Sequence, residues 1–121
     1  MGDPLDRSCA TVLKAFFNES YIILDSVEAS ADGTRLEPWR GDQLTLGGEI
    51  NKLAANIALA RDAAGVHFRS DSIEGLKLGE QVAISLLADY SRTYNERFDG
   101  FVLSRMNGSR IRISGGSVYP D

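Results

Sequence analysis

Two long stretches of this sequence place apolar residues along one side of a helix, and they constrain the fold more than any other feature. In residues 45–64 and again in residues 72–92, apolar positions recur in steps of three and four. Such stripes predict two amphipathic helices, the first ending at Gly65, a residue type favoured just beyond a helix. The stripe positions are Leu46, Ile50, Leu53, Ile57, Ala60 and Ala64, then Leu76, Gly79, Ala83, Leu86 and Tyr90.

Shorter patterns complete a mainly α fold. After an irregular start over residues 1–7, apolar residues at helical spacing predict a helix over residues 8–19. Residues 20–44 contain turn signals and indicate an irregular connector, with a small strand pair as one option. Near the end, Asn107-Gly108 between two partly alternating runs predicts a type I′ β-hairpin over residues 100–114. We therefore expect about three helices of a helical bundle plus a short C-terminal hairpin.

The predicted stripes are too extensive for three helices to cover. Part of the apolar surface should therefore be exposed on this chain, at the place where preceding helices of a larger bundle would pack. Dimerisation or association with another chain would hide it equally well. A homo-oligomer is one expectation from this feature.

Charge and composition exclude several classes of partner. The formal charge of −4 argues against nonspecific binding of nucleic acid or anionic lipid, which needs a basic surface. An anionic ligand would require a local basic pocket. Cys9 is the only cysteine and can form no internal disulfide, which slightly favours a reduced compartment. The sequence has neither a membrane-spanning apolar run nor a signal-peptide pattern at its start, so we expect a soluble protein whose location is otherwise open.

The only histidine, His67, lies where one predicted helix stops and the next begins. Arg61 lies one turn after Ile57 beside the apolar stripe, where an arginine side chain needs an anion. A break at Gly65 would let Arg61 and His67 face one pocket, and Asp71 could hold one ring nitrogen of His67. The common alternative for a lone histidine at a helix junction is a structural role. Residue chemistry alone therefore predicts no more than a possible oxyanion pocket.

The pattern Arg61, five residues, His67, three residues, Asp71 matches the third signature motif of the phosphatidic acid phosphatase type 2 and haloperoxidase superfamily. Ala60 replaces the serine that usually begins this motif. The wider sequence around it, Gly65-Val-His-Phe-Arg-Ser-Asp71, resembles vanadium-dependent haloperoxidases, with Phe68 in place of a common tryptophan. The resemblance extends from Cys9 onward and implies the C-terminal portion of such an enzyme.

The resemblance implies a vanadate cofactor and a role for each motif residue. Arg61 would bind the vanadate oxygens, His67 would bond to vanadium, and Asp71 would orient His67. Hydrogen peroxide and a halide would be the substrates. In the phosphatase branch of the superfamily, His67 would instead be the nucleophile that accepts a phosphoryl group.

Two further motifs of the superfamily have no counterpart in this chain. Neither a lysine followed at the required spacing by Arg-Pro nor a Pro-Ser-Gly-His sequence occurs. The chain alone is therefore expected to be incomplete, with the missing motifs on an N-terminal half or a second chain. An acid phosphatase and a noncatalytic fragment are the alternatives to a haloperoxidase.

Other polar and aromatic residues have simpler interpretations. Glu80 is expected to form an ion pair between helices or at an interface, and Cys9 to be a small buried side chain. Phe16 and Phe17 are interpreted as core or interface aromatics.

Overall fold

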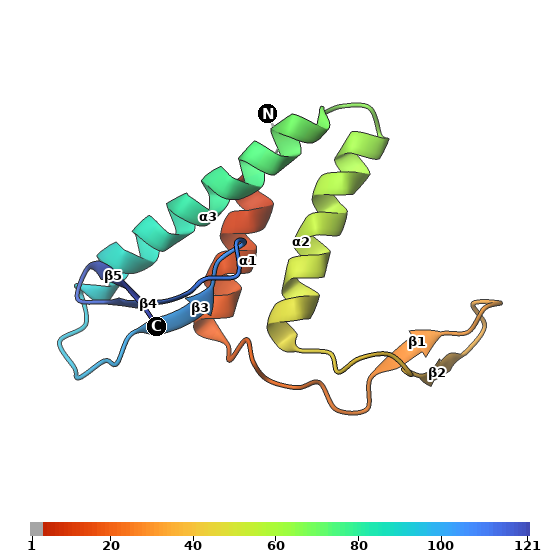
Figure 1. The fold of residues 1–121 in the computed structure, drawn as a ribbon, viewed down its shortest axis with the longest axis horizontal. Coiled ribbons are helices and arrows are strands. Elements are labelled where there is room, and N and C mark those ends of the chain that lie inside the picture. Colours follow the sequence, from red (N-terminus) through yellow and green to blue (C-terminus); the bar gives the residue numbers. More distant parts are fainter. Residues whose placement is uncertain (1–3) are drawn as a thin grey trace.

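A computed structural model describes residues 4–121, and Figure 1 shows a mainly α chain with a small C-terminal sheet. The predicted fold class is confirmed. None of the helices within residues 4–121 is long and apolar enough to cross a membrane. The elements are α1 (Pro4–Phe16), β1 (Val27–Ala29), β2 (Leu36–Pro38), α2 (Leu46–Ala63), α3 (Arg69–Ser91), β3 (Phe101–Ser104), β4 (Arg110–Ser114) and β5 (Ser117–Pro120).

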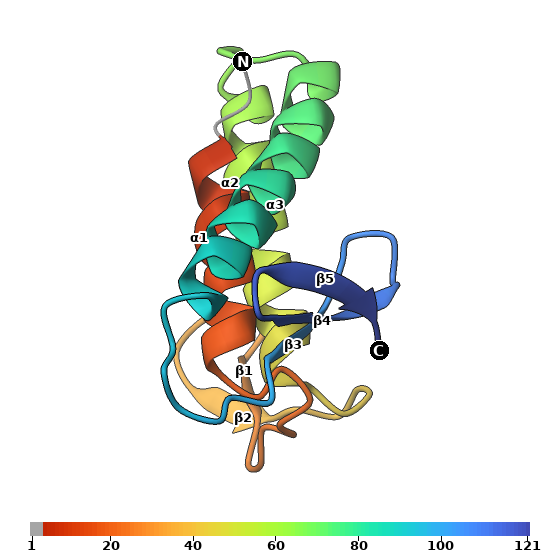
Figure 2. The same ribbon diagram turned by 90° about the vertical axis from the view of Figure 1, so that its left-hand side faces the viewer.

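The three helices form one layer, and the C-terminal sheet covers only one side of it. Helix α1 contacts both α2 and α3. Figure 2 shows β4 and β5 projecting to one side of the helices, while β3 lies closer in and contacts α1. The sheet is antiparallel in the order β3-β4-β5. The apolar core lies between α3 and this sheet, and its buried members are Ile84, Leu87, Leu103, Ile111 and Ile113.

Helix α1 begins at Pro4, earlier than the expected start at residue 8. A proline suits the first turn of a helix because the amide hydrogen it lacks would have no partner there. The helix also ends earlier, at Phe16 rather than residue 19, after which residues 17–20 form turns. The segment expected to be irregular therefore contributes Arg7 to the first helix.

The orientation of α1 differs from what its apolar pattern indicates. Its buried face carries polar side chains, and Arg7, Thr11 and Lys14 are 4%, 0% and 0% exposed. The expectation that Cys9 is buried was wrong, because Cys9 is exposed on the opposite face. Phe16 also lies largely in solvent, at 77% exposure. Helical spacing identified two faces of α1 but placed the wrong one inward.

The connector contains the small strand pair that its turn signals left open. Strands β1 and β2 pair in antiparallel register, with Glu28 opposite Glu37. Asp32 organises the turn between them, because its Oδ1 accepts hydrogen bonds from Ser30 Oγ at 2.6 Å and Thr34 Oγ1 at 2.8 Å. The hydrogen bond from Ser30 and those from Thr34 lower the pKa of Asp32 to about 2.

We expect the carboxyl group of Asp32 to titrate with a midpoint of about 2. Its lowered pKa means that the turn's hydrogen bonds are intact above the ordinary pKa of 3.8 and are lost as the pH falls through about 2. Carbon NMR of the Asp32 carboxyl group would measure the midpoint. Ser30→Ala should raise it, whereas Ser26→Ala, outside the turn, should not. A wild-type midpoint near 3.8 would contradict the hydrogen-bonded turn.

Helix α2 begins with a side-chain cap and a close approach to the end of α1. Thr45 Oγ1 accepts a hydrogen bond from the amide of Gly48, which satisfies an otherwise unpaired group of the first turn. A side chain at Gly47 would meet the Cβ of Glu19 at 2.8 Å, so only glycine fits beside that backbone. On the predicted apolar stripe, Leu53 and Ile57 remain 62% and 40% exposed.

Helix α3 packs closely on α1 through small residues. Gly75 and Gly79, one turn apart, are both buried, and Ser8 Oγ donates a hydrogen bond to the carbonyl of Gly79 at 2.9 Å. Helix α3 starts at Arg69 rather than residue 72, so Asp71 belongs to its first turn.

The C-terminal hairpin is present, but its turn is not type I′. That turn requires positive φ at both Asn107 and Gly108, and only Gly108 has it, at 83°. The loop is instead one residue longer, and the amide of Arg105 donates to the carbonyl of Ser109 at 2.8 Å. Asn107 Oδ1 accepts from the amide of Ser109, which holds Asn107 in its negative-φ conformation. A third strand, β5, extends the predicted hairpin into a sheet.

Candidate functional site

The three residues of the predicted site lie around one turn between two long helices. Arg61 is in the last turn of α2, His67 is in the connection formed by residues 64–68, and Asp71 is in the first turn of α3. Figure 1 shows this connection at one end of the helical layer, far from β1 and β2. All three residues are half-buried. The fold therefore places a guanidinium, an imidazole and a carboxylate in one short segment that solvent can reach.

Backbone hydrogen bonds define the end of α2 and hence the direction of the chain toward His67. The amides of Gly65 and Val66 donate to the carbonyls of Asp62 and Arg61, the paired arrangement typical of a glycine-terminated helix. Gly65 has a φ of 75°, which a residue with a side chain adopts only with strain. This break separates Arg61 from His67, as the sequence predicted. A continuous helix would have put them on different faces.

Asp71 caps the helix that follows. Its Oδ2 accepts a hydrogen bond from the amide of Phe68 at 3.2 Å, and its own amide donates to the carbonyl of Phe68 at 2.9 Å. A carboxylate in the first turn also interacts favourably with the positive end of the helix dipole. Asp71 therefore fixes the backbone directly after His67. Its predicted contact with the His67 ring stays a prediction.

A hydrogen bond between side chains, which sequence reasoning missed, joins α2 to α3 next to the turn. Ser72 is 6% exposed and its Oγ donates to Asp62 Oδ1 at 2.7 Å. Asp62 directly follows Arg61 and Ser72 directly follows Asp71, so the bond closes the base of the loop that carries His67. No sequence pattern indicates this bond, because the two residues become neighbours only after α2 and α3 fold back on each other.

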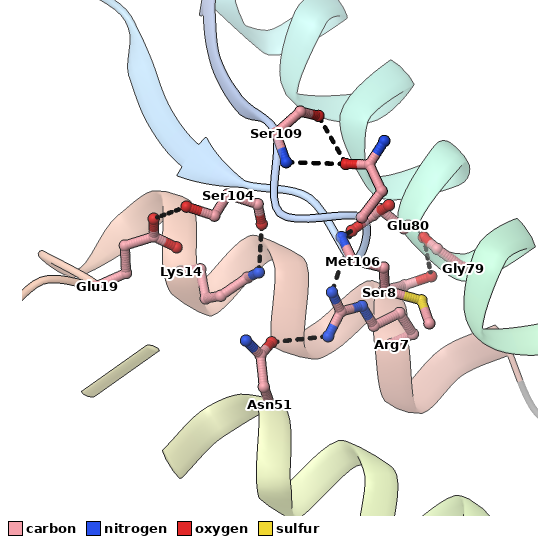
Figure 3. Close-up of polar contacts among 11 residues, drawn as sticks. Arg7, Ser8, Lys14, Glu19, Asn51, Gly79, Glu80, Ser104, Met106 and Ser109 are labelled. Carbon is pink, nitrogen blue, oxygen red and sulfur yellow. Dashed lines mark hydrogen bonds and ion pairs between the residues drawn. The ribbon is translucent and has the colours of Figure 1, made fainter. Parts of the chain in front are cut away.

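A cluster of buried charges lies further along the helices (Figure 3). Glu80 Oε1 accepts hydrogen bonds from Arg7 Nη2 at 3.0 Å and from the amide of Met106 at 2.7 Å, while Arg7 Nη1 donates to Asn51 Oδ1 at 2.7 Å. This confirms the expectation that Glu80 forms an ion pair between helices. Glu80 follows Asp71 by nine residues on α3, about 13 Å along the helix axis, so the cluster is distinct from the candidate site.

Lys14 belongs to the same buried region. Its Nζ donates to the carbonyl of Ser104 at 2.5 Å, and the Oγ of Ser104 donates to Glu19 Oε1 at 2.6 Å. Burial, followed by repulsion from Arg7, lowers the pKa of Lys14. Sequence reasoning missed this lysine, although Arg7, Thr11 and Lys14 share the spacing of a helical face. The cluster joins α1 to α3 and the sheet and is structural.

The donor set of the candidate site suits an oxyanion better than a bare metal cation. Within residues 4–121, no group of three or more histidine, cysteine or acidic side chains is arranged to hold a metal ion. Arg61 offers a permanent positive charge with several N–H donors, and His67 offers a ring nitrogen as a ligand. An arginine and a histidine together can bind the oxygens of an anion and place a ring nitrogen of the histidine at the anion's central atom.

Comparisons with known proteins identify relatives. No family model matches the chain. It is 45% identical over 108 residues to a vanadium-dependent bromoperoxidase of Corallina officinalis, and 46% identical over 108 residues to one of Corallina pilulifera. A third, from Ascophyllum nodosum, is 37% identical over 126 residues. These matches cover 88%, 88% and 91% of this chain but only 18%, 18% and 22% of the relatives, so the chain spans about a fifth of their length.

Proposed function

From the homology of this chain to a segment of vanadium-dependent bromoperoxidases, we propose that it forms part of a vanadium-dependent haloperoxidase. The whole protein would use hydrogen peroxide to oxidise a halide, and this segment would supply one side of the vanadate pocket. The observation that carries the proposal is the placement of Arg61, His67 and Asp71 around one defined turn, in a chain homologous to these enzymes over most of its length.

Each of the three side chains has a distinct role in this proposal. Arg61 neutralises and orients the oxygens of the anion, because a guanidinium donates several hydrogen bonds in a fixed plane. His67 is the ligand to vanadium through one ring nitrogen. Asp71 is a positioning residue that fixes the backbone after His67 through its hydrogen bond to the amide of Phe68.

When bound at this pocket, vanadate supplies the Lewis-acidic centre at which hydrogen peroxide becomes reactive toward a halide. The protein's part is to hold the anion and to fix its surroundings in advance. The hydrogen-bonded turn at Gly65 and the bond between Ser72 and Asp62 support this, because they limit how far His67 can move relative to Arg61. The three relatives described above are all bromoperoxidases, and we do not propose the phosphatase activity.

A chimeric enzyme tests the proposal. The matching segment of the Corallina officinalis bromoperoxidase would be replaced by this chain, and bromination with peroxide and vanadate would be measured. We expect turnover that falls by on the order of a hundredfold or more in His67→Ala and in Arg61→Ala, since each change removes a preorganised contact. Arg97→Ala is the matched control, because the Arg97 side chain is 96% exposed and far along the chain from the site.

Vanadium NMR of the same proteins would measure binding separately from turnover. Vanadate should bind saturably to the chimera and to the Arg97→Ala control and only weakly to the His67→Ala variant. A folded chimera that binds vanadate equally well with and without His67 would refute the proposed role of this residue. A folded chimera without substitutions that neither binds vanadate nor brominates would refute the proposed function.

A further inference from the structure

The outward face of α1 is apolar from Cys9 to Phe16. Cys9 is exposed, and Leu13 and Phe16 are 43% and 77% exposed, at successive turns of the helix. The inward face of the same helix holds Arg7 and Lys14. A surface helix normally buries its apolar stripe and exposes its polar one. Here the arrangement is reversed, so the apolar face needs a cover that residues 4–121 do not supply.

Two apolar grooves lie on either side of this face. The groove toward α2 has a volume of about 140 Å³, the groove toward α3 has a volume of about 270 Å³, and neither lining contains a charged residue. The first is lined by Cys9, Ala10, Leu13, Ile50, Leu53, Ala54 and Ile57. The second is lined by Val12, Phe16, Leu86, Leu87, Tyr90, Tyr94 and Phe101.

A row of exposed apolar residues on α3, which coincides only partly with the stripe that the sequence indicated, extends the same surface beyond the groove. Leu78, Val82, Leu86 and Tyr90 recur at every fourth residue and are between 42% and 54% exposed. On the opposite side of the layer, the comparable surface of α3 is covered by the sheet. A domain is built from packed layers with a core between them. The helical layer has the sheet as a second layer on one side, but no layer packs on its α1 side.

We propose that the apolar face of α1, defined by Cys9, Leu13 and Phe16 with the two flanking grooves, is the docking surface for apolar helices from the rest of the haloperoxidase polypeptide. About four-fifths of the length of the three relatives lies outside the segment that this chain matches. Grooves that run beside a helix, without charges in their linings, fit the apolar stripe of another helix. The proposal rests on the proposed function only for the identity of this polypeptide.

Docking on this face would also explain why α1 buries charges. With apolar helices on its outer side, α1 becomes an interior helix of a larger bundle. Its charged residues Arg7 and Lys14 then occupy the side that faces Glu80, Asn51 and the carbonyl of Ser104, where they have hydrogen-bond partners. The side without such partners is left to apolar side chains.

Cys9 provides a direct probe, because it is the only cysteine of the chain and lies on the proposed surface. Alkylation by iodoacetamide, followed by mass spectrometry of the peptide, would be measured for the chain alone and for the chimera described above. We expect the labelling rate of Cys9 to fall at least tenfold in the chimera. A cysteine introduced by Val27→Cys, on β1 and 54% exposed in the wild type, should be labelled at similar rates in both.

Phe16→Asp tests the face independently of the probe. In the chain alone this change should leave the melting temperature and the circular dichroism spectrum unchanged, because Phe16 is 77% exposed. In the chimera it should reduce the folded yield and restore labelling of Cys9. Unfolding of the isolated chain by Phe16→Asp would overturn the proposal, because the face would then belong to the chain's own core.

The remaining outcomes also decide the question. Rapid labelling of Cys9 in a folded chimera would overturn the proposal. Failure of the chimera to fold even when Phe16 is unchanged would overturn it as well. Concentration-dependent protection of Cys9 in the isolated chain, unchanged in the chimera, would show that a second copy is the occupant instead. Since labelling requires neither vanadate nor turnover, a chimera that protects Cys9 without brominating would count against the proposed function alone.

Discussion

Replacing Glu80 by alanine is expected to destabilise the isolated chain by about 3–5 kcal/mol, the cost typical of removing one partner from a buried ion pair. Arg7 is only 4% exposed, and its guanidinium would keep its charge without the carboxylate at 3.0 Å. The buried Lys14 on the same face of α1 would also lose its attraction to Glu80. The amide of Met106 would also lose its acceptor. Urea unfolding followed by circular dichroism would measure the change.

Glu74→Ala on the same helix is the matched control for Glu80→Ala. Its exposed ion pair with Lys77 should contribute only a few tenths of a kcal/mol. Replacing Arg7 and Glu80 together by methionine should cost less than Glu80→Ala alone, because no buried charge then remains unpaired in that pair. Equal losses of stability from Glu74→Ala and Glu80→Ala would show that the cluster is solvated rather than buried.

Leu103→Ala is expected to lower the free energy of unfolding by about 2–5 kcal/mol, as for other fully buried leucines. Leu103 is 0% exposed and lies in β3, where it belongs to the same buried cluster as Ile84 and Leu87 of α3. Truncation would leave a cavity in the apolar core between the helices and the sheet. Differential scanning calorimetry would detect the loss as a lower melting temperature.

Leu36→Ala gives the corresponding control for Leu103→Ala. Leu36 is 71% exposed in β2, so its truncation should change stability by less than about 0.5 kcal/mol. A similarly small effect of Leu103→Ala would mean that the sheet does not pack on α3 in solution. The sheet would then cover neither side of the helical layer.

Much of the candidate site was predictable because its geometry is local. The stop at Gly65 follows from glycine's access to positive φ, and it alone determines that Arg61 and His67 lie on either side of a break. The capping role of Asp71 is equally local, since its carboxylate reaches the amide of Phe68 three residues back. The bond between Ser72 and Asp62 was not predictable, because it depends on how two helices cross.

The periodicity of the sequence by itself determined that residues 4–121 form three helices and that the longest two are separated by a break. It also indicated the excess of apolar surface, whereas the motif around the single histidine identified the segment that carries Arg61, His67 and Asp71. Only the tertiary structure decided which face of α1 turns inward. Periodicity defines the faces of a helix, but the choice between them depends on partners distant in sequence, here Glu80 and Ser104, which provide acceptors for Arg7 and Lys14. Charges with partners are buried on that side, and the apolar stripe of α1 is left to face outward.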